Sequence, residues 1–150
     1  MRRQQIVCFR KKDLTLVMQL SFRLNKTPDF IFDYLTDMQK FVSVHPVIFQ
    51  IDRIADENYL VQETLKFGYI PFSFTYPVTI EKNSDDKVVV IRATVMKLTK
   101  IEMRFVIKTD QDHSIVDEHI QFKSALPLKF AMQRIFKKQH HQLFQNIGLK

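Results

Sequence analysis

The sequence predicts an α+β fold with a strand, two short helices, six further strands and a long C-terminal helix. Apolar and polar residues alternate with a period of two from Val47 to Ser124, and the period becomes helical after Pro127. Helix-start signals at Thr27-Pro28-Asp29 place the short helices before the long alternating region. The length of 150 residues is that of one compact domain with a single hydrophobic core.

The first predicted strand shows strict alternation. Its apolar face consists of Leu14, Leu16, Met18, Leu20, Phe22 and Leu24. Most positions between them are polar, and this pattern is typical of a strand that buries one face.

Two short helices are expected after this strand. Thr27 is an N-cap residue, Pro28 takes the first helical position, and Asp29 lies in the first turn. Asp37 is expected to cap a second helix that runs through Phe41. The helical region then ends at Val44-His45-Pro46, because the residue before a proline is driven to extended geometry.

Six strands are predicted in the alternating region. The breaks between them fall at residues 55–58, 68, 82–86, near 99 and at 110–112. Each strand has one apolar and one polar face, as in an antiparallel meander. Pro71 and Pro77 lie in the polar register of one strand. Because proline donates no ladder hydrogen bond, we place that strand at an edge or at a bulge.

The last element is a helix about twenty residues long. Its apolar stripe consists of Leu128, Met132, Ile135, Phe136, Leu143 and Ile147, and Gly148 is a natural stop. A helix of this length spans about 30 Å, which is enough to cross the concave face of a seven-stranded sheet and bury the stripe there.

The composition argues against several kinds of site. Glycine occurs only as Gly68 and Gly148, so no glycine-rich phosphate loop can be written. The single cysteine, Cys8, cannot make an intramolecular disulfide or a cysteine-rich zinc site. His140 and His141 are adjacent on a helix and point about 100° apart, which argues against a shared metal ion. We therefore predict no metal site and no cofactor, and a classical hydrolase or metalloenzyme is disfavoured.

The net charge of +7 is concentrated at the two ends of the chain. The basic residues in question are Arg2, Arg3, Arg10, Lys11 and Lys12 before the first strand, and Lys129, Arg134, Lys137 and Lys138 on the final helix. The simpler interpretation is solvated charge that aids solubility. The more specific interpretation is a patch that binds an anionic membrane surface, where each basic group contributes about 1 kcal/mol to the binding free energy. Nucleic acid is disfavoured as a partner, because no arginine-rich run appears.

No targeting or membrane-spanning segment is expected. The apolar residues near the N-terminus are too few for a signal-peptide core, and no stretch approaches the ~18 apolar residues of a membrane span. A single cysteine fits a reducing compartment. The sequence therefore predicts a soluble, unprocessed protein of the cytoplasm.

Residues 28–37, PDFIFDYLTD, and residues 41–46, FVSVHP, resemble the opening of the START-like superfamily (SRPBCC). The resemblance is to its polyketide cyclase/dehydrase and lipid-transport branch, and it covers about residues 13–147 in element order. The chain departs from this pattern in two ways. It lacks the tryptophan common just before the His-Pro, and it lacks the glycine-rich loop of the plant pollen-allergen branch.

The resemblance implies a helix-grip fold, in which a curved seven-stranded antiparallel sheet wraps the C-terminal helix around an apolar cavity. It divides the chain into a basic N-terminal arm, residues 1–12, and a single START-like domain, residues 13–150. Family members bind lipids, quinones, polyketides and similar molecules, and some catalyse cyclisation or dehydration. A binding protein for a hydrophobic small molecule is therefore our first hypothesis. The alternatives are a cyclase or dehydratase that acts with cavity carboxyls, and a non-catalytic interaction module with a filled core.

Polar residues that interrupt the apolar faces are the candidate ligand-binding residues, because an unpaired carboxyl in an apolar interior costs several kcal/mol. Glu63 and Glu118 each interrupt one such face, and Tyr76 adds a phenol. His45 is expected beside the cavity mouth, and Phe74 and Phe105 are apolar wall residues. The alternative for each carboxyl is a bulge that turns it to solvent. No residue is assigned a catalytic role.

Overall fold

The structure is a computed structural model that describes residues 8–9, 15–127 and 129–150. Its elements follow the predicted order. The helices are α1 (Pro28–Thr36), α2 (Met38–Val44) and α3 (Lys129–Gly148). The strands are β1 (Cys8–Phe9), β2 (Thr15–Leu24), β3 (Ile48–Ala55), β4 (Asn58–Phe67), β5 (Ile70–Asn83), β6 (Val88–Val95), β7 (Thr99–Asp110) and β8 (His113–Ser124).

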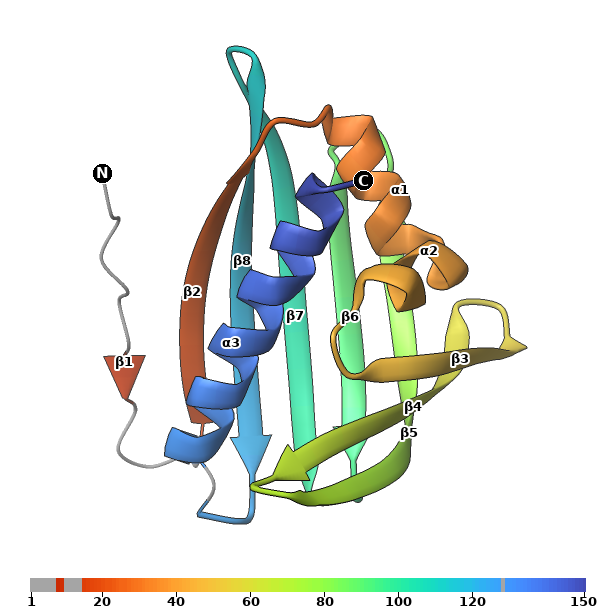
Figure 1. The fold of residues 1–150 in the computed structure, drawn as a ribbon, viewed down its shortest axis with the longest axis vertical. Coiled ribbons are helices and arrows are strands. Elements are labelled where there is room, and N and C mark those ends of the chain that lie inside the picture. The colour runs from red at the N-terminus through yellow and green to blue at the C-terminus, as the bar shows by residue number, and fades with distance from the viewer. Residues whose placement is uncertain (1–7, 10–14, 128) are drawn as a thin grey trace.

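The strands form one antiparallel sheet in the order β1-β2-β8-β7-β6-β5-β4-β3. The sheet curves around α3, which lies along its concave face (Figure 1). Strands β2 to β8 are the seven predicted ones, so the helix-grip architecture is confirmed. The two-residue β1 is absent from the prediction, because two residues carry no periodicity. The rest of the predicted basic arm lies outside the described residues.

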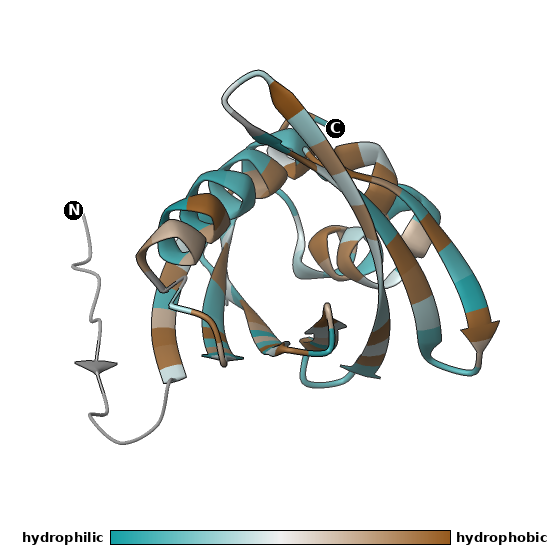
Figure 2. Cartoon of the chain, turned by 90° about the horizontal axis from the view of Figure 1, so that it is seen from below, coloured by the Kyte–Doolittle hydropathy of each residue, from teal (hydrophilic) through white to brown (hydrophobic). Residues whose placement is uncertain are grey.

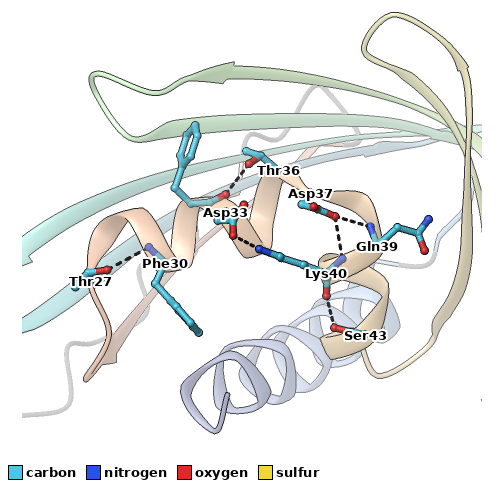
Figure 3. A network of polar contacts seen from close by, with 9 residues as sticks. Thr27, Phe30, Asp33, Thr36, Asp37, Gln39, Lys40 and Ser43 are labelled. Atoms are coloured by element: carbon cyan, nitrogen blue, oxygen red, sulfur yellow. Dashed lines mark hydrogen bonds and ion pairs between the residues drawn. The ribbon is translucent and has the colours of Figure 1, made fainter.

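The two short helices form for the reasons that the sequence indicates. The Thr27 side chain accepts a hydrogen bond from the Phe30 amide at 3.2 Å, and Pro28 opens α1. The Asp37 carboxylate accepts from the amides of Gln39 and Lys40 at 3.0 and 3.1 Å and caps α2 (Figure 3). Helix α2 runs to Val44, three residues beyond the predicted end at Phe41.

The prolines of β5 lie where that strand has a neighbour on one side only. Strand β5 is internal in the sheet, so an edge position is wrong for the strand as a whole. Its pairing with β6 begins at Val78, however, whereas Pro71 and Pro77 pair only with β4. The first half of β5 is thus a local edge, where the missing N–H groups of the prolines break no ladder.

Helix α3 turns the described part of the predicted stripe toward the sheet. Phe136, Leu143 and Ile147 are buried, Met132 and Ile135 are half-buried, and Leu128 lies outside the described residues. The stripe also includes Phe144, whose ring stacks on Phe22 of β2 with centroids 4.3 Å apart. The Asn146 side chain donates to the Val44 carbonyl at 2.8 Å and ties the end of α3 to α2. These contacts hold α3 against one side of the curved sheet, as Figure 2 shows from below.

The basic residues of α3 lie away from this stripe. Arg134, Lys137 and Lys138 are exposed, as the sequence predicts, while the side chain of Lys129 and residues 2, 3 and 10–12 lie outside the described part of the chain. Among the helices that the structure describes, none is long and apolar enough to cross a membrane.

Candidate ligand-binding site

A cavity of about 180 Å³ lies between α3 and the concave face of the sheet. Side chains from α2, from β3 to β8 and from α3 line it, and most of them are aliphatic or aromatic. Because the walls come from nearly every element of the fold, the cavity is a property of the whole architecture rather than of one loop.

Glu63 and Tyr76 form a buried hydrogen-bonded pair in the cavity wall. They lie diagonally on the neighbouring strands β4 and β5, because Glu63 is registered with Phe74 and Tyr76 with Val61. The Tyr76 hydroxyl donates to Glu63 Oε2 at 2.6 Å, and each residue is only 8% exposed.

The environment favours the neutral form of both groups. Burial raises the pKa of Glu63, while hydrogen bonds from Tyr76 and Gln139 and the charge of His140 offset part of that rise. Burial, together with the negative charge of Glu63, raises the pKa of Tyr76 well above its usual value. The pair therefore places a carboxyl group with a raised pKa in an apolar wall.

His140 and Glu118 form a second buried pair, between α3 and β8. His140 Nδ1 lies 2.5 Å from Glu118 Oε1, and the two residues are 3% and 2% exposed. A ring nitrogen that faces a carboxylate carries a proton, so Nε2 is the nitrogen left for a molecule in the cavity. The second carboxylate oxygen, Glu118 Oε2, is buried without a hydrogen-bond partner among the described residues. Glu118 itself is not among the residues that line the cavity, so it contacts His140 from the side away from the cavity.

Aromatic rings hold the His140 imidazole in place. Phe105 stacks on it with ring centroids 6.4 Å apart, and Phe136 meets it edge-on at 5.4 Å. With Glu118 behind the ring and two phenylalanines beside it, the imidazole has little freedom to turn.

His45 lies at the junction of α2 and β3, where it also lines the cavity. Its Nδ1 accepts hydrogen bonds from the amides of Ile48 at 3.1 Å and Val47 at 3.4 Å. Burial, together with repulsion from His140, lowers the pKa of His45 to about 3. The ring is therefore neutral near pH 7, and its role in the fold is to close the turn into β3.

The predicted site residues thus separate into two groups. Five of them line the cavity, namely His45, Glu63, Phe74, Tyr76 and Phe105, while Glu118 lies behind it. The sequence reasoning missed His140 and Gln139. His140 stands four residues after Phe136 and three before Leu143, so it interrupts the stripe of α3 as Glu63 interrupts that of β4. This spacing is the signal that marks it.

His140 and His141 do not share a site. His141 is exposed, and its Nδ1 contacts the Lys137 carbonyl oxygen at 2.8 Å. Over residues 8–9, 15–127 and 129–150, no group of three or more histidine, cysteine or acidic side chains is arranged to hold a metal ion.

Comparison with known proteins shows similarity of structure without similarity of sequence. No protein-family model matches the chain. No curated protein sequence matches it either. The crystal structure of Ara h 8.0201 has a TM-score of 0.73 at 12% identity, over 89% of this chain and 95% of that one.

Two further structures show the same fold. A START superfamily protein from Mycobacterium smegmatis has a TM-score of 0.73 at 11% identity, over 88% of this chain and 94% of that one. The di-domain ARO/CYC StfQ from the steffimycin biosynthetic pathway has a TM-score of 0.74 at 10% identity, over 93% of this chain and 51% of that one. This chain thus corresponds to about half of StfQ. The curved sheet, the two short helices and α3 give this chain the START-like helix-grip fold. This is the fold that the sequence resemblance of residues 28–46 implies.

Proposed function

We propose that the protein binds an apolar small molecule in the cavity beneath α3, and that Glu63, Tyr76 and His140 hold the polar group of that molecule. The observation that carries the proposal is the contrast inside the cavity. Its walls are mainly apolar, yet hydrogen-bonding side chains from β4, β5 and α3 face the same space. A few convergent polar groups in an apolar pocket are typical of small-molecule sites.

The polar groups favour a ligand with a hydroxyl group. The Tyr76 hydroxyl already donates its hydrogen bond to Glu63, so toward a ligand the phenol oxygen acts mainly as an acceptor. A hydroxyl both donates and accepts, and so fits either protonation state of Glu63 and of His140 Nε2. A fatty-acid carboxylate fits less well, because its charge would face the oxygens of Glu63 and Tyr76. Among lipids, quinones and polyketide-like molecules, the hydroxylated and phenolic members match best.

Native mass spectrometry of the protein purified from its source tests the proposal. We expect an added mass that is lost under denaturing conditions and that belongs to an apolar, hydroxylated molecule. We also expect the neutral fluorophore N-phenylnaphthylamine to brighten on binding and to be displaced by that molecule. A protein that carries no added mass and leaves the fluorophore dark would contradict ligand binding and support an interaction module.

Acid–base catalysis on a polyketide-like substrate is a second candidate, supported by the His140–Glu118 pair. In a dehydration, His140 Nε2 would take a proton from carbon, and protonated Glu63 would give its proton to the leaving hydroxyl, which departs as water. Glu118 would be a positioning residue, because it holds the imidazole from behind and balances its positive charge.

A β-hydroxyketone of the polyketide type distinguishes the two functions. Recovery of this compound unchanged after incubation with the protein supports a binding protein. Loss of one water, reduced in both the H140Q and the E63Q variants while binding persists, supports the enzyme. The same loss of water in both variants would reject these catalytic roles.

A further inference from the structure

The cavity reaches the surface at one end of the molecule. Phe72 of β5 and Met96 in the β6–β7 turn both line the cavity, yet their exposed fractions are 45% and 61%. All other described lining residues are buried or half-buried. The mouth of the cavity therefore lies between the β4–β5 and β6–β7 turns, at the end where α3 begins. Figure 2 looks onto this end.

Large apolar side chains gather around the mouth. The exposed ones are Tyr69, Ile70 and Phe72 at the β4–β5 turn, Met96 and Leu98 at the β6–β7 turn, and Phe130 in the first turn of α3. The Ala125 amide donates to the Leu98 carbonyl at 3.3 Å, so the β6–β7 turn is joined to the segment that leads into α3. Ile70 is 72% exposed and Phe130 is 78% exposed. Exposed apolar side chains that gather in one place, unlike scattered ones, mark sites of interaction with proteins or membranes.

Basic residues lie around this apolar rim, and the described segments that form it include no acidic residue. Segments 65–73, 95–101 and 122–134 contain no aspartate or glutamate. They contribute four exposed lysines, which are Lys66, Lys97, Lys100 and Lys123.

The opposite end of the molecule carries charges of both signs. Its acidic residues are Asp29, Asp33, Asp37, Asp85, Asp86, Asp110 and Asp112, from α1, the start of α2 and the β5–β6 and β7–β8 turns. Its basic residues are Arg23, Lys26, Lys40, Lys82, Lys87, Lys108 and Lys150. Three of them, Arg23, Lys40 and Lys87, are paired with Asp110, Asp33 and Asp29. An anionic surface would therefore attract the mouth end, whose exposed charges are basic, more strongly than the far end, where the two signs offset each other. Figure 1 shows the two ends at the bottom and the top of the view.

We propose that the mouth end is a docking surface for an anionic lipid bilayer. Its exposed apolar side chains would enter the headgroup boundary, and its lysines would meet the anionic headgroups. Such docking would place the opening at Phe72 and Met96 against the hydrocarbon, so that an apolar ligand could pass between bilayer and cavity without crossing water. The docking surface and the cavity are tested separately. A protein that binds no vesicles can still bind a ligand in the cavity, and a protein with an empty cavity can still bind vesicles.

Vesicle sedimentation tests the charge part of the proposal. We expect the protein to sediment with vesicles of phosphatidylcholine and phosphatidylserine, less with phosphatidylcholine alone, and less again as salt is raised. The K66Q/K97Q double variant should bind the anionic vesicles roughly 30-fold more weakly, from two lysines acting at an anionic surface. The matched control K82Q/K150Q removes two exposed lysines at the opposite end of the molecule and should bind as the parent does. If the two double variants lose vesicle binding equally, the binding depends on the net charge of the protein and not on this surface, which would overturn the proposal.

A second pair of variants tests the apolar part. Y69S/I70S removes two exposed side chains from the β4–β5 turn, and I54S/L149S removes two exposed apolar side chains away from the mouth. We expect Y69S/I70S to lose binding to anionic vesicles and I54S/L149S to keep it, with unchanged thermal unfolding in both. Parent protein that binds no vesicles would overturn the proposal. If it instead forms a dimer that Y69S/I70S dissociates, the surface is an interface between two copies.

Discussion

His140 Nδ1 and Glu118 Oε1 lie 2.5 Å apart although the two residues come from α3 and β8, on opposite sides of the core. This contact is a buried polar link between α3 and the sheet, inside a mainly apolar interior. It fixes the rotation of α3 at the point where His140 meets the cavity. The stability of the fold and the geometry of the site therefore depend on the same pair.

Replacing Glu118 should destabilise the fold strongly. Glu118→Ala leaves the buried His140 ring nitrogen without its partner, and breaking a buried pair typically costs about 3–5 kcal/mol. Glu118→Gln keeps an acceptor for Nδ1–H and should cost about 1–3 kcal/mol. Urea unfolding followed by circular dichroism measures both. The control is Glu102→Gln, which removes an exposed carboxylate paired with Arg92 on the outer face. A loss in the control as large as that in Glu118→Ala would contradict the assigned role.

The stability contributed by Glu63 should fall as pH rises. Burial raises the pKa of Glu63 in the folded protein above its ordinary value of 4.5. Between these two pKa values, the folded state holds a proton that the unfolded chain has released. The favourable contribution is fully present below pH 4.5 and is lost as pH rises through the raised pKa. In Glu63→Gln this dependence is absent. We therefore expect the unfolding free energy of the variant to increase relative to that of the parent as pH rises.

Urea unfolding of the parent and of Glu63→Gln across this pH range measures the difference. Glu81→Gln is the matched control, because Glu81 lies on the neighbouring strand β5 with an exposed side chain. A constant difference between the parent and Glu63→Gln at all pH values would show that the Glu63 pKa is not raised.

His45 should produce the opposite dependence. Burial and repulsion from His140 lower its pKa from 6.5 to about 3. Between these two pH values, the unfolded chain binds a proton that the folded protein does not bind. The stability contribution is present above pH 6.5 and is lost as pH falls toward 3. His45→Asn keeps a side-chain acceptor for the Ile48 amide but cannot titrate in this range. The parent should therefore lose stability relative to this variant on acidification, and parallel pH profiles in urea unfolding would contradict the lowered pKa.

The sequence predicts most of the fold because the relevant signals are local. The alternation of Leu16 to Leu24 predicts β2, and the Thr27-Pro28 cap predicts α1, since each depends on residues a few positions apart. The positions of Pro71 and Pro77 in the sheet are not predictable in this way, because a proline is tolerated in β5 only where β6 does not pair with it. That register depends on the pairing of two strands, so the residue pattern of one strand alone does not predict it.

The site was predictable only in part. Period-two alternation identifies Glu63 and Glu118 as inward-facing, and both are buried. Their partners depend on long-range packing. Glu63 meets Tyr76 through the β4–β5 register, whereas Glu118 meets His140 only because α3 lies across β8 at one particular rotation. Sequence spacing marks His140 as a member of the buried stripe, but it cannot tell which side of the ring faces the cavity.

Ala93 offers a direct test of whether the cavity is the ligand site. It lies on β6 in the cavity wall, is 5% exposed, and carries the smallest side chain of the lining. Ala93→Phe should fill part of the 180 Å³ space and weaken binding of N-phenylnaphthylamine at least tenfold, because probe and ring would compete for the same volume. The unfolding free energy should stay level or rise, since the new ring buries apolar surface in existing space, whereas insertion into a tightly packed core costs about 1–3 kcal/mol. Ala55→Phe, at the exposed end of β3, is the control and should leave probe binding unchanged. Undiminished probe binding in Ala93→Phe would place the ligand outside this cavity.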